Sequence, residues 1–373
     1  MAEPGEAKLN GRDHPRYRAM IGVGGIGSGL FFALEGNQTL GRNESRQARL
    51  IPAQDYCKLH IVAHYVAALV GAEHSGTPFD VIPIGKVGND SDGLRLKKEM
   101  AQIGMDTTYV DIVDGRPTLL SICYQYPDQS SGNITTSDSA AASLTNNDVD
   151  RVIPLFELYH DRFIALAVPE VSLAVRNHFL TLATAYGAWR VGSFTSAEIL
   201  DAESLDLISM VDLLAINEDE AAALIGRAFN PNDPQDFLDK CAIRLTETQP
   251  RIKIVISAGK EGVFAFADEQ WFRFPALAVK TFSTTGAGDA LLAGIISGLV
   301  LGLPFINNPA TPNTDPLGAF GSALDLGVLL ASFSVTSPHT IHPDASMSNL
   351  LDFAGDLGLS ERPLKDLAAG QRE

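Results

Sequence analysis

Short apolar runs alternate with segments of helical periodicity along most of the chain, and this order restricts the fold more than any other feature. The strand-like runs lie at residues 19–23, 79–84, 163–168, 188–191, 213–216 and 252–257. Helical spacing of apolar residues lies between them, at 62–70, 93–103, 171–186 and 218–224. Strands that alternate with helices form mostly parallel sheets covered on both faces. The sequence therefore predicts an α/β fold in three layers, with a mostly parallel central sheet between helices.

Two polar regions interrupt this order. Residues 29–57 are polar and contain several glycines, and residues 107–138 include an alternating run that is typical of antiparallel strands. We assign both segments to a small β flap, or lid, over the edge of the sheet. The main domain is expected at residues 19–350, between an N-terminal tail (1–18) and a C-terminal helix or tail (351–373). The proline-rich stretch at 306–321 is expected to be a surface loop.

Composition disfavours several classes of protein. Of the 373 residues 45% are hydrophobic, which is enough for a large core. The net charge of −17 disfavours binding to nucleic acid or to an anionic membrane surface. The three cysteines, Cys57, Cys123 and Cys241, are far apart and predict neither a disulfide framework nor a zinc site, in keeping with a reducing compartment. No apolar leader follows Met1 and no apolar run is long enough to span a bilayer, so a cytoplasmic protein is expected.

The segment that says most about chemistry is residues 283–289, Ser-Thr-Thr-Gly-Ala-Gly-Asp. It leads from a strand-like stretch at 276–282 into an apolar helix at 290–303. Small residues let backbone amides approach an anion, and a helix N-terminus adds unpaired donors and a positive dipole end. Asp289, in the first helical turn, is a candidate general base for an attacking hydroxyl. The candidate anion hole consists of three backbone amides, those of Gly286, Ala287 and Gly288. A helix cap and a tight turn remain the simpler alternative.

This run resembles the signature of the ribokinase-like (PfkB-type) carbohydrate kinase family, and other segments agree with that family in order. Residues 84–90 with Gly93, and residues 115–118, are similar to its Gly-Asp segment and its Pro-Thr strand start. Residues 217–220 resemble its Asn-x-x-Glu motif, which implies that Asn217 and Glu220 organise Mg²⁺, mostly through water. An Asn helix cap followed by acids is the alternative there. Residues 257–262 resemble its nucleotide loop, which implies a nucleotide border made of Ser257, Gly259, Gly262 and, from the anion turn, Thr285.

The resemblance implies a ribokinase-like three-layer sandwich with a lid, and a kinase that uses ATP and Mg²⁺. The γ-phosphoryl group would go to a hydroxyl of a small carbohydrate-like, nucleoside-like or sugar-acid substrate bound between the sheet edge and the lid. Residues 306–321 and 334–342 would close over adenine. Lid edges in this family often pair between subunits, which implies a homodimer through the lid.

The sequence departs from the family on the substrate side. Ser283 stands where many members carry an Asp that helps to hold a monovalent cation, which puts potassium dependence in question. The usual carboxylate after the first strand is absent from residues 24–29, and the usual Gly-Gly-Asn entry to the helix before Val62 is not intact. The remaining candidates for substrate binding are Gly29, Arg42, Asn43 and Glu170. A solvated arginine and a helix-end acid are the simpler interpretations of Arg42 and Glu170.

Three other hypotheses are open at this point. Residues 22–27 form a Gly-x-Gly-x-x-Gly pattern after a strand, which would suit an NAD-dependent dehydrogenase. The altered sugar site would also suit a non-catalytic metabolite-binding relative of the kinases. His60 and His64 would share a helix face, but with no third ligand nearby they indicate surface or core residues rather than a metal site.

Overall fold

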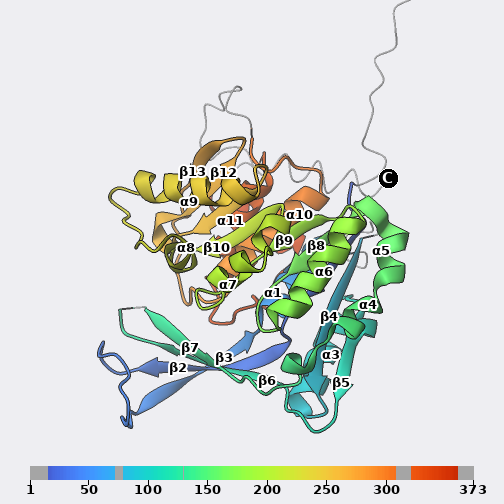
Figure 1. Cartoon of the computed structure of the whole chain (residues 1–373). Coiled ribbons are helices and arrows are strands. Elements are labelled where there is room, and N and C mark those ends of the chain that lie inside the picture. Colours follow the sequence, from blue (N-terminus) through green and yellow to red (C-terminus); the bar gives the residue numbers. More distant parts are fainter. Residues whose placement is uncertain (1–15, 72–78, 129, 308–320, 360–373) are drawn as a thin grey trace, which may run out of the picture.

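A nine-stranded sheet forms the middle layer of the computed structural model, which describes residues 16–71, 79–128, 130–307 and 321–359 (Figure 1). The strand order is β13-β12-β11-β10-β9-β8-β1-β4-β5, and every neighbouring pair from β11 to β5 is parallel. The strands are β1 (Ala19–Val23), β4 (Asp80–Gly88), β5 (Val110–Val113), β8 (Phe163–Ala167), β9 (Trp189–Gly192), β10 (Leu213–Asn217), β11 (Lys253–Ser257), β12 (Val263–Ala267) and β13 (Gln270–Phe274). The predicted α/β fold with a mostly parallel sheet is confirmed.

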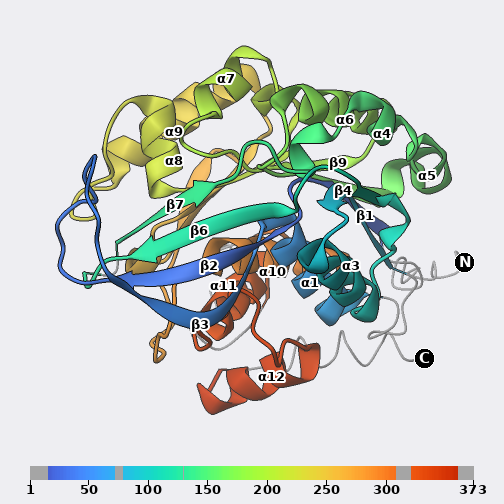
Figure 2. The ribbon, with the colours of Figure 1, turned by 90° about the horizontal axis from the view of Figure 1, so that it is seen from below.

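Helices cover both faces of this sheet (Figure 2). One layer contains α1 (Lys58–Val70), α3 (Ser91–Gln102), α10 (Ala287–Val300), α11 (Ala323–Ser334) and α12 (Met347–Asp356). The other contains α4 (Asn146–Asp150), α5 (Ile153–Tyr159), α6 (Leu173–Ala185), α7 (Ile199–Ser204), α8 (Glu218–Ile225) and α9 (Gln235–Thr248). Short 3₁₀ helices lie at Thr107–Tyr109, Ala141–Ser143, His160–Arg162, Ile208–Met210 and Gly259–Glu261.

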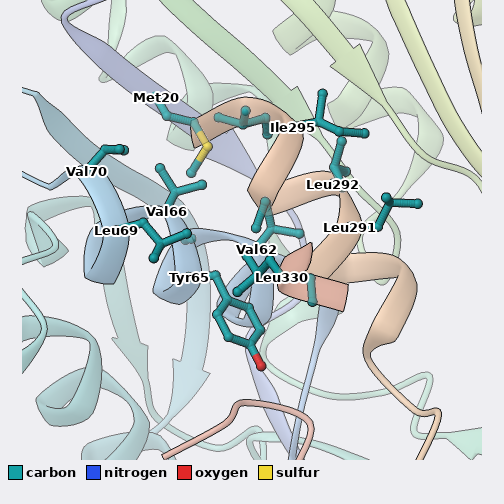
Figure 3. Packing of buried hydrophobic residues seen from close by; sticks show 14 of the residues in the cluster. Met20, Val62, Tyr65, Val66, Leu69, Val70, Leu291, Leu292, Ile295 and Leu330 are labelled. Carbon is teal, nitrogen blue, oxygen red and sulfur yellow. The ribbon is translucent and has the colours of Figure 1, made fainter. Parts of the chain in front are cut away.

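The core has two halves, because side chains alternate between the two faces of each buried strand. Along β8, Ile164 and Leu166 pack in the half that contains α1 and α10, whereas Phe163 and Ala165 pack in the other half. Figure 3 shows the first half, where Val62 and Val66 of α1 lie near Leu292 and Ile295 of α10. This packing fixes α10, and therefore its first turn, against the carboxyl edge of the sheet.

Glycines let α10 and α11 pack closely. A Cβ added at Gly294 would lie 2.7 Å from the Cα of Gly327, and one added at Gly298 would lie 2.7 Å from the Cα of Ala323. Contacts this short admit no side chain at either position. The glycines within the apolar run 290–303 are therefore explained by helix packing. No helix among the described residues has both the length and the apolar character needed to cross a bilayer.

A second sheet forms the lid, below the carboxyl edge of the large sheet (Figures 1 and 2). It consists, in spatial order, of β3 (Ala48–Tyr56), β2 (Gly27–Leu34), β6 (Leu119–Gln125) and β7 (Ser131–Thr135). The β2–β3 and β6–β7 pairs are antiparallel, and β2 pairs with β6 in parallel. Residues 107–113, expected in the lid, lie outside it. They form a 3₁₀ turn followed by β5, which belongs to the large sheet.

One strand expectation is wrong. Residues 276–282 form no strand, because the antiparallel hairpin β12–β13 already occupies that edge of the sheet and ends at Phe274. The segment leads to α10 with most of its residues exposed, and the Phe282 amide donates to the carbonyl of Val335 (2.8 Å). The domain limits stay a prediction, since α12 crosses the expected boundary at residue 350 and residues 1–15 and 360–373 lie outside the described chain.

Candidate active site

The first turn of α10 carries the predicted base and the predicted anion hole. Gly286 caps the helix with φ 81°, a left-handed conformation that glycine adopts without strain. The Ala287 amide donates to the carbonyl of Thr284 (3.2 Å), which closes the turn, and the Ser283 hydroxyl accepts from the Thr285 amide (3.3 Å). Asp289 lies in the first helical turn with its side chain 13% exposed. The turn therefore has the conformation expected of a backbone anion site.

Lys58, at the start of α1, contacts this carboxylate. Its Nζ lies 3.0 Å from Oδ1 of Asp289 and 3.1 Å from Oγ of Ser193, which follows β9. Burial by itself would lower the pKa of Lys58, but the charges of Asp289 and Glu220 raise it overall. The lysine is therefore cationic at neutral pH and forms an ion pair with the candidate base.

Three further acids surround this pair: Asp55 on β3, Glu170 just after β8, and Glu220 in the first turn of α8. Burial raises the pKa of Asp55 to about 6 and that of Glu170 to about 8, and the charge of Asp289 adds to both rises. Burial also raises the pKa of Glu220, against the lowering effect of Lys58. Four acids from different segments of the chain therefore lie at this site, and three of them, Asp289, Glu220 and Glu170, interact electrostatically with Lys58.

Glycines after β1 make room for Glu170. A Cβ added at Gly25 would lie 2.4 Å from the Cβ of Glu170, and one added at Gly24 would lie 2.4 Å from Val168. Glu170 itself adopts φ 75°, and its Oε2 is buried without a hydrogen-bond partner. The glycine pattern at 22–27 is followed by β2 rather than by a helix, so the dinucleotide-binding interpretation is wrong. Of these glycines, Gly25 allows the close approach of Glu170, and Gly24 that of Val168.

Asp55 fills the space beside Gly29 on the lid. A Cβ at Gly29 would lie 1.9 Å from Oδ2 of Asp55, and the Cys123 thiol donates to the same oxygen (3.4 Å). Gly29 and Asp55 are direct partners in the β2–β3 ladder. They also border a pocket of about 340 Å³ whose other wall includes Asp92 and Arg95 of α3. A carboxylate from the lid therefore lies near the position where residues 24–29 provide none.

Thr340 joins the lid to the anion turn. Its amide donates to the carbonyl of Gln54 (3.1 Å), and its hydroxyl accepts from the Tyr56 amide (3.1 Å), both on β3. Its carbonyl would lie 2.9 Å from a Cβ added at Gly286. The segment 334–342, predicted to lie over adenine, thus packs between β3 and the start of α10. Most of the other segment assigned to adenine, 306–321, lies outside the described residues.

The predicted magnesium residues form a helix cap. The Asn217 side chain accepts from the Glu220 amide (2.8 Å), and Oε2 of Glu220 accepts from the Asn217 amide (2.8 Å). This is the Asn helix cap that was the simpler interpretation of the motif. The cap also places Glu220 within electrostatic reach of Lys58 and Asp289. Among the described residues, no group of three or more His, Cys, Asp or Glu side chains could hold a metal ion.

The predicted nucleotide loop lies beside the anion turn. A Cβ added at Gly288 would come within 3.7 Å of Oγ of Ser257, at the end of β11. Gly259 and Gly262 adopt φ 50° and 90°, and a Cβ at Gly262 would lie 2.1 Å from the carbonyl oxygen of Phe274. The structure therefore brings this loop and the candidate base together at one edge of the sheet.

The two segments that resemble the family's Gly-Asp and Pro-Thr motifs, residues 84–90 with Gly93 and residues 115–118, meet where the lid joins the large sheet. Asp90 caps α3 by accepting from the Gly93 amide (2.8 Å), and it also accepts from the amide and the hydroxyl of Thr118 (2.8 and 2.6 Å). The Thr118 hydroxyl in turn accepts from the Gly88 amide (2.9 Å). These bonds attach Thr118, the residue before β6, to Gly88 of β4 and to Asp90. Asp90 therefore connects the lid to the large sheet.

Other candidates lie elsewhere. Arg42 and Asn43 occupy an exposed turn between β2 and β3. Figures 1 and 2 show this connection at the end of the lid, away from α10. Their role in substrate binding stays a prediction. His60 is buried in α1 beside the ring of Tyr56, with ring centroids 4.6 Å apart. Burial holds the pKa of His60 well below its usual value, so the ring is neutral.

Residues 62–346, well over half of the chain, match the model of the pfkB family of carbohydrate kinases. The chain belongs to this family. Family members are phosphotransferases with an alcohol group as acceptor. An ATP-dependent 6-phosphofructokinase of Thermoanaerobacterium thermosaccharolyticum is 35% identical over 96 residues, which are 26% of this chain and only 27% of that relative. A fructokinase of Escherichia coli is 24% identical over 229 residues, covering 58% of this chain and 70% of the relative.

Solved structures show the same fold. A ribokinase from Giardia lamblia matches with a TM-score of 0.71 at 14% identity, over 90% of this chain and 99% of that chain. A nucleoside kinase from Burkholderia thailandensis in complex with inosine matches with a TM-score of 0.65 at 14% identity, over 91% and 99%. At this identity the likeness concerns the fold, and it confirms the ribokinase-like sandwich.

Sequence reasoning missed Lys58, Asp55, Ser193 and Thr340. Lys58 and Asp55 stand at the junction of β3 and α1, where the family's Gly-Gly-Asn entry was sought and not found. A lysine and an acid beside an otherwise apolar helix entry were the available signal. Ser193 and Thr340 gave none, because only the tertiary fold brings them to the site.

Proposed function

We propose that this pfkB family member transfers the γ-phosphoryl group of ATP to a hydroxyl group of a small carbohydrate or nucleoside. The observation that supports this best is the ion-paired Asp289 in the first turn of α10, beside the backbone amides of the Gly286 turn. A carboxylate that can accept a proton lies next to donors that can stabilise charge on a transferring phosphoryl group.

In the proposed reaction, Asp289 takes the proton of the acceptor hydroxyl. The acceptor oxygen forms a bond to the γ-phosphorus, the bond to the bridging oxygen breaks, and its electron pair leaves with ADP. The amides of Gly286 and Gly288 stabilise the transferring oxygens, whereas the third predicted donor, the Ala287 amide, already donates to the Thr284 carbonyl. Ser257, Gly259, Gly262 and Thr285 border the nucleotide.

Magnesium fits this site through water. Two oxygens of the Asn217–Glu220 cap are already used by backbone amides, and no cluster of three ligands exists in the described part of the chain. Mg²⁺ usually keeps several waters and binds through one or two carboxylates plus substrate phosphates, so Asn217 and Glu220 suit it. When bound, it would neutralise charge on the phosphates.

The acids on the acceptor side support a neutral substrate. Asp55 and Glu170 can accept hydrogen bonds from hydroxyl groups, whereas Lys58 is already paired with Asp289. A second phosphate or a carboxylate on the acceptor would meet like charge. We therefore favour neutral sugars and nucleosides as acceptors over sugar acids and phosphorylated sugars. The name of the 6-phosphofructokinase relative would instead suggest a phosphorylated sugar.

The test is a coupled ADP-release assay with MgATP and a panel of neutral sugars and nucleosides, each paired with its phosphorylated or acidic form. Turnover with a neutral member, lost in Asp289→Asn, is the expected result. Saturable binding of an acceptor without product would identify a non-catalytic relative instead. Turnover confined to phosphorylated acceptors would contradict the neutral class.

We also propose that the protein is cytoplasmic and that it forms a homodimer through the lid. Leu30, Leu50, Ile122 and Ile134 are exposed. Ladder partners place these side chains on the face opposite Asp55, because Leu30 pairs with Ile122, Ile122 with Ile134, and Phe32 with Leu50. A second copy of the lid would cover this face. Light scattering of the wild type and of Ile122→Lys checks this proposal: a dimer that dissociates supports it, and a wild-type monomer at micromolar concentration contradicts it.

A further inference from the structure

We propose that Lys58 is a positioning residue for Asp289, holding one carboxylate oxygen in place so that the other oxygen can take the acceptor proton. The inference rests on the proposed function, in which Asp289 is the base. Nothing in the resemblance to the family assigns Lys58, which stands where the expected Gly-Gly-Asn entry is missing.

The lysine head group is fixed by partners from two other elements. Nζ lies 3.0 Å from Oδ1 of Asp289 and donates to Oγ of Ser193 at 3.1 Å. Ser193 is itself fully buried, and its carbonyl accepts from Nη1 of Arg176 (3.3 Å). Arg176 is also fully buried and pairs with Glu198 (2.5 Å). Buried partners therefore hold the Lys58 head group, which contacts one oxygen of Asp289.

Local stability does not explain a lysine at this position. Lys58 is the first residue of α1, where the positive end of the helix dipole disfavours a cation. The first turn of α1 has no acidic residue to offset this charge. The compensating charge comes from Asp289, on another helix. The position is thus explained by its partner in the site.

Asp289 lies among other acids. Asp55 on β3, Glu170 after β8 and Glu220 on α8 all interact electrostatically with Asp289, as does Tyr65 on α1. Where these acids are ionised they disfavour a further negative charge, whereas the start of α10 and Lys58 favour it. Asp55 and Glu170 form no ion pair among the described residues, and burial raises the pKa of the former to about 6 and of the latter to about 8.

The test is the split between kcat and KM for wild type, Lys58→Met and Lys58→Arg, because a residue that positions the base acts on the transfer step and not on substrate binding. We expect Lys58→Met to lower kcat ~10–100-fold, while the KM values for MgATP and for the acceptor change less than about threefold. Lys58→Arg should restore part of the lost kcat, since it keeps the charge.

A kcat in Lys58→Met within about threefold of wild type would overturn the inference. If Lys58→Met fails to fold, Lys58→Gln replaces it, and a double-mutant comparison adds a second readout. In an Asp289→Asn background, removing the Lys58 charge should change the residual rate less than about threefold, and a further tenfold loss would show a role that does not act through Asp289. Wild type and Asp289→Asn, measured first, test the proposed function separately. A wild type without transfer removes both claims, whereas an unchanged kcat in Lys58→Met removes only this one.

Discussion

At the scale of single residues, Asp55 shows how the lid can supply a group that the main sheet lacks. Residues 24–29 contain no carboxylate, and their glycines instead admit Glu170 and Asp55. The carboxyl group of Asp55 receives the Cys123 thiol and lies within electrostatic reach of Asp289. A hydroxyl-rich acceptor would therefore meet one acid from the lid and one from the sheet, both within electrostatic reach of the candidate base.

Replacing Asp55 by Asn should weaken acceptor binding selectively. A hydrogen bond to a charged group contributes ~1.5–3 kcal/mol, so the acceptor KM should rise ~10–100-fold while the KM for MgATP changes less than about threefold. Because the pKa of Asp55 is raised to about 6, the wild-type acceptor KM should also rise as pH falls from 7 to 5, as the carboxylate becomes protonated.

Steady-state kinetics at pH 5, 6 and 7 check both effects. Asp128→Asn, an exposed lid substitution, is the matched control and should behave as wild type. Equal acceptor KM values for Asp55→Asn and wild type at pH 7 would remove Asp55 from the acceptor site.

At the scale of elements, the turn before α10 depends on a glycine and on its neighbour from another segment. Gly286 needs φ 81°, and the Thr340 carbonyl occupies the space where its Cβ would be. The same Thr340 bonds to Gln54 and Tyr56 of β3. The anion turn and the lid are therefore connected through one residue.

Gly286→Ala and Gly302→Ala form a matched pair that separates backbone strain from this connection. Both glycines have left-handed φ values, 81° and 83°, but a Cβ at Gly302 would meet nothing within 4 Å. Each substitution should cost ~1–2 kcal/mol of stability in chemical denaturation. Only Gly286→Ala should also lower kcat, by at least about tenfold, because it displaces Thr340 and the anion turn. Equal kcat values for the two variants would contradict the role of this contact.

The elements also show what the sequence could predict. The strands β1, β8, β10 and β11 agree with their predicted ranges within one residue, because a parallel strand buried on both faces is a continuous apolar run. The β12–β13 hairpin was missed, and residues 276–282 were wrongly assigned, since an alternating run does not reveal whether a partner strand is available. The motif at 283–289 located Asp289. Ser193 and Thr340 could not be predicted, because their contacts join segments far apart in the chain.

At the scale of the whole molecule, the charge of the site affects stability. Burial raises the pKa of Glu170 to about 8 from an ordinary value of 4.5. Between these values the folded protein holds a proton that the unfolded chain has lost. The stability contributed by this proton is fully present below pH 4.5 and is lost as pH rises to about 8. Burial of Glu170 at the candidate site therefore lowers the free energy of unfolding as pH rises.

Glu170→Gln should remove that pH dependence. From pH 6.5 to 8, one such group lowers the free energy of unfolding by up to ~1.4 kcal/mol per pH unit, and Gln does not titrate. Urea denaturation without ligands at pH 6.5, 7.25 and 8 should therefore show a steeper decline for wild type than for the variant. Parallel declines would mean that Glu170 is already ionised at pH 6.5 in the folded protein.

The central claim is that Asp289 accepts the acceptor proton during phosphoryl transfer. Single-turnover transfer from MgATP, measured for wild type and Asp289→Asn together with the Kd for MgATP, tests it most directly. The account predicts a fall of at least ~10²-fold in the transfer rate, with the Kd for MgATP changed less than about threefold. A transfer rate in Asp289→Asn within a few-fold of wild type would contradict it.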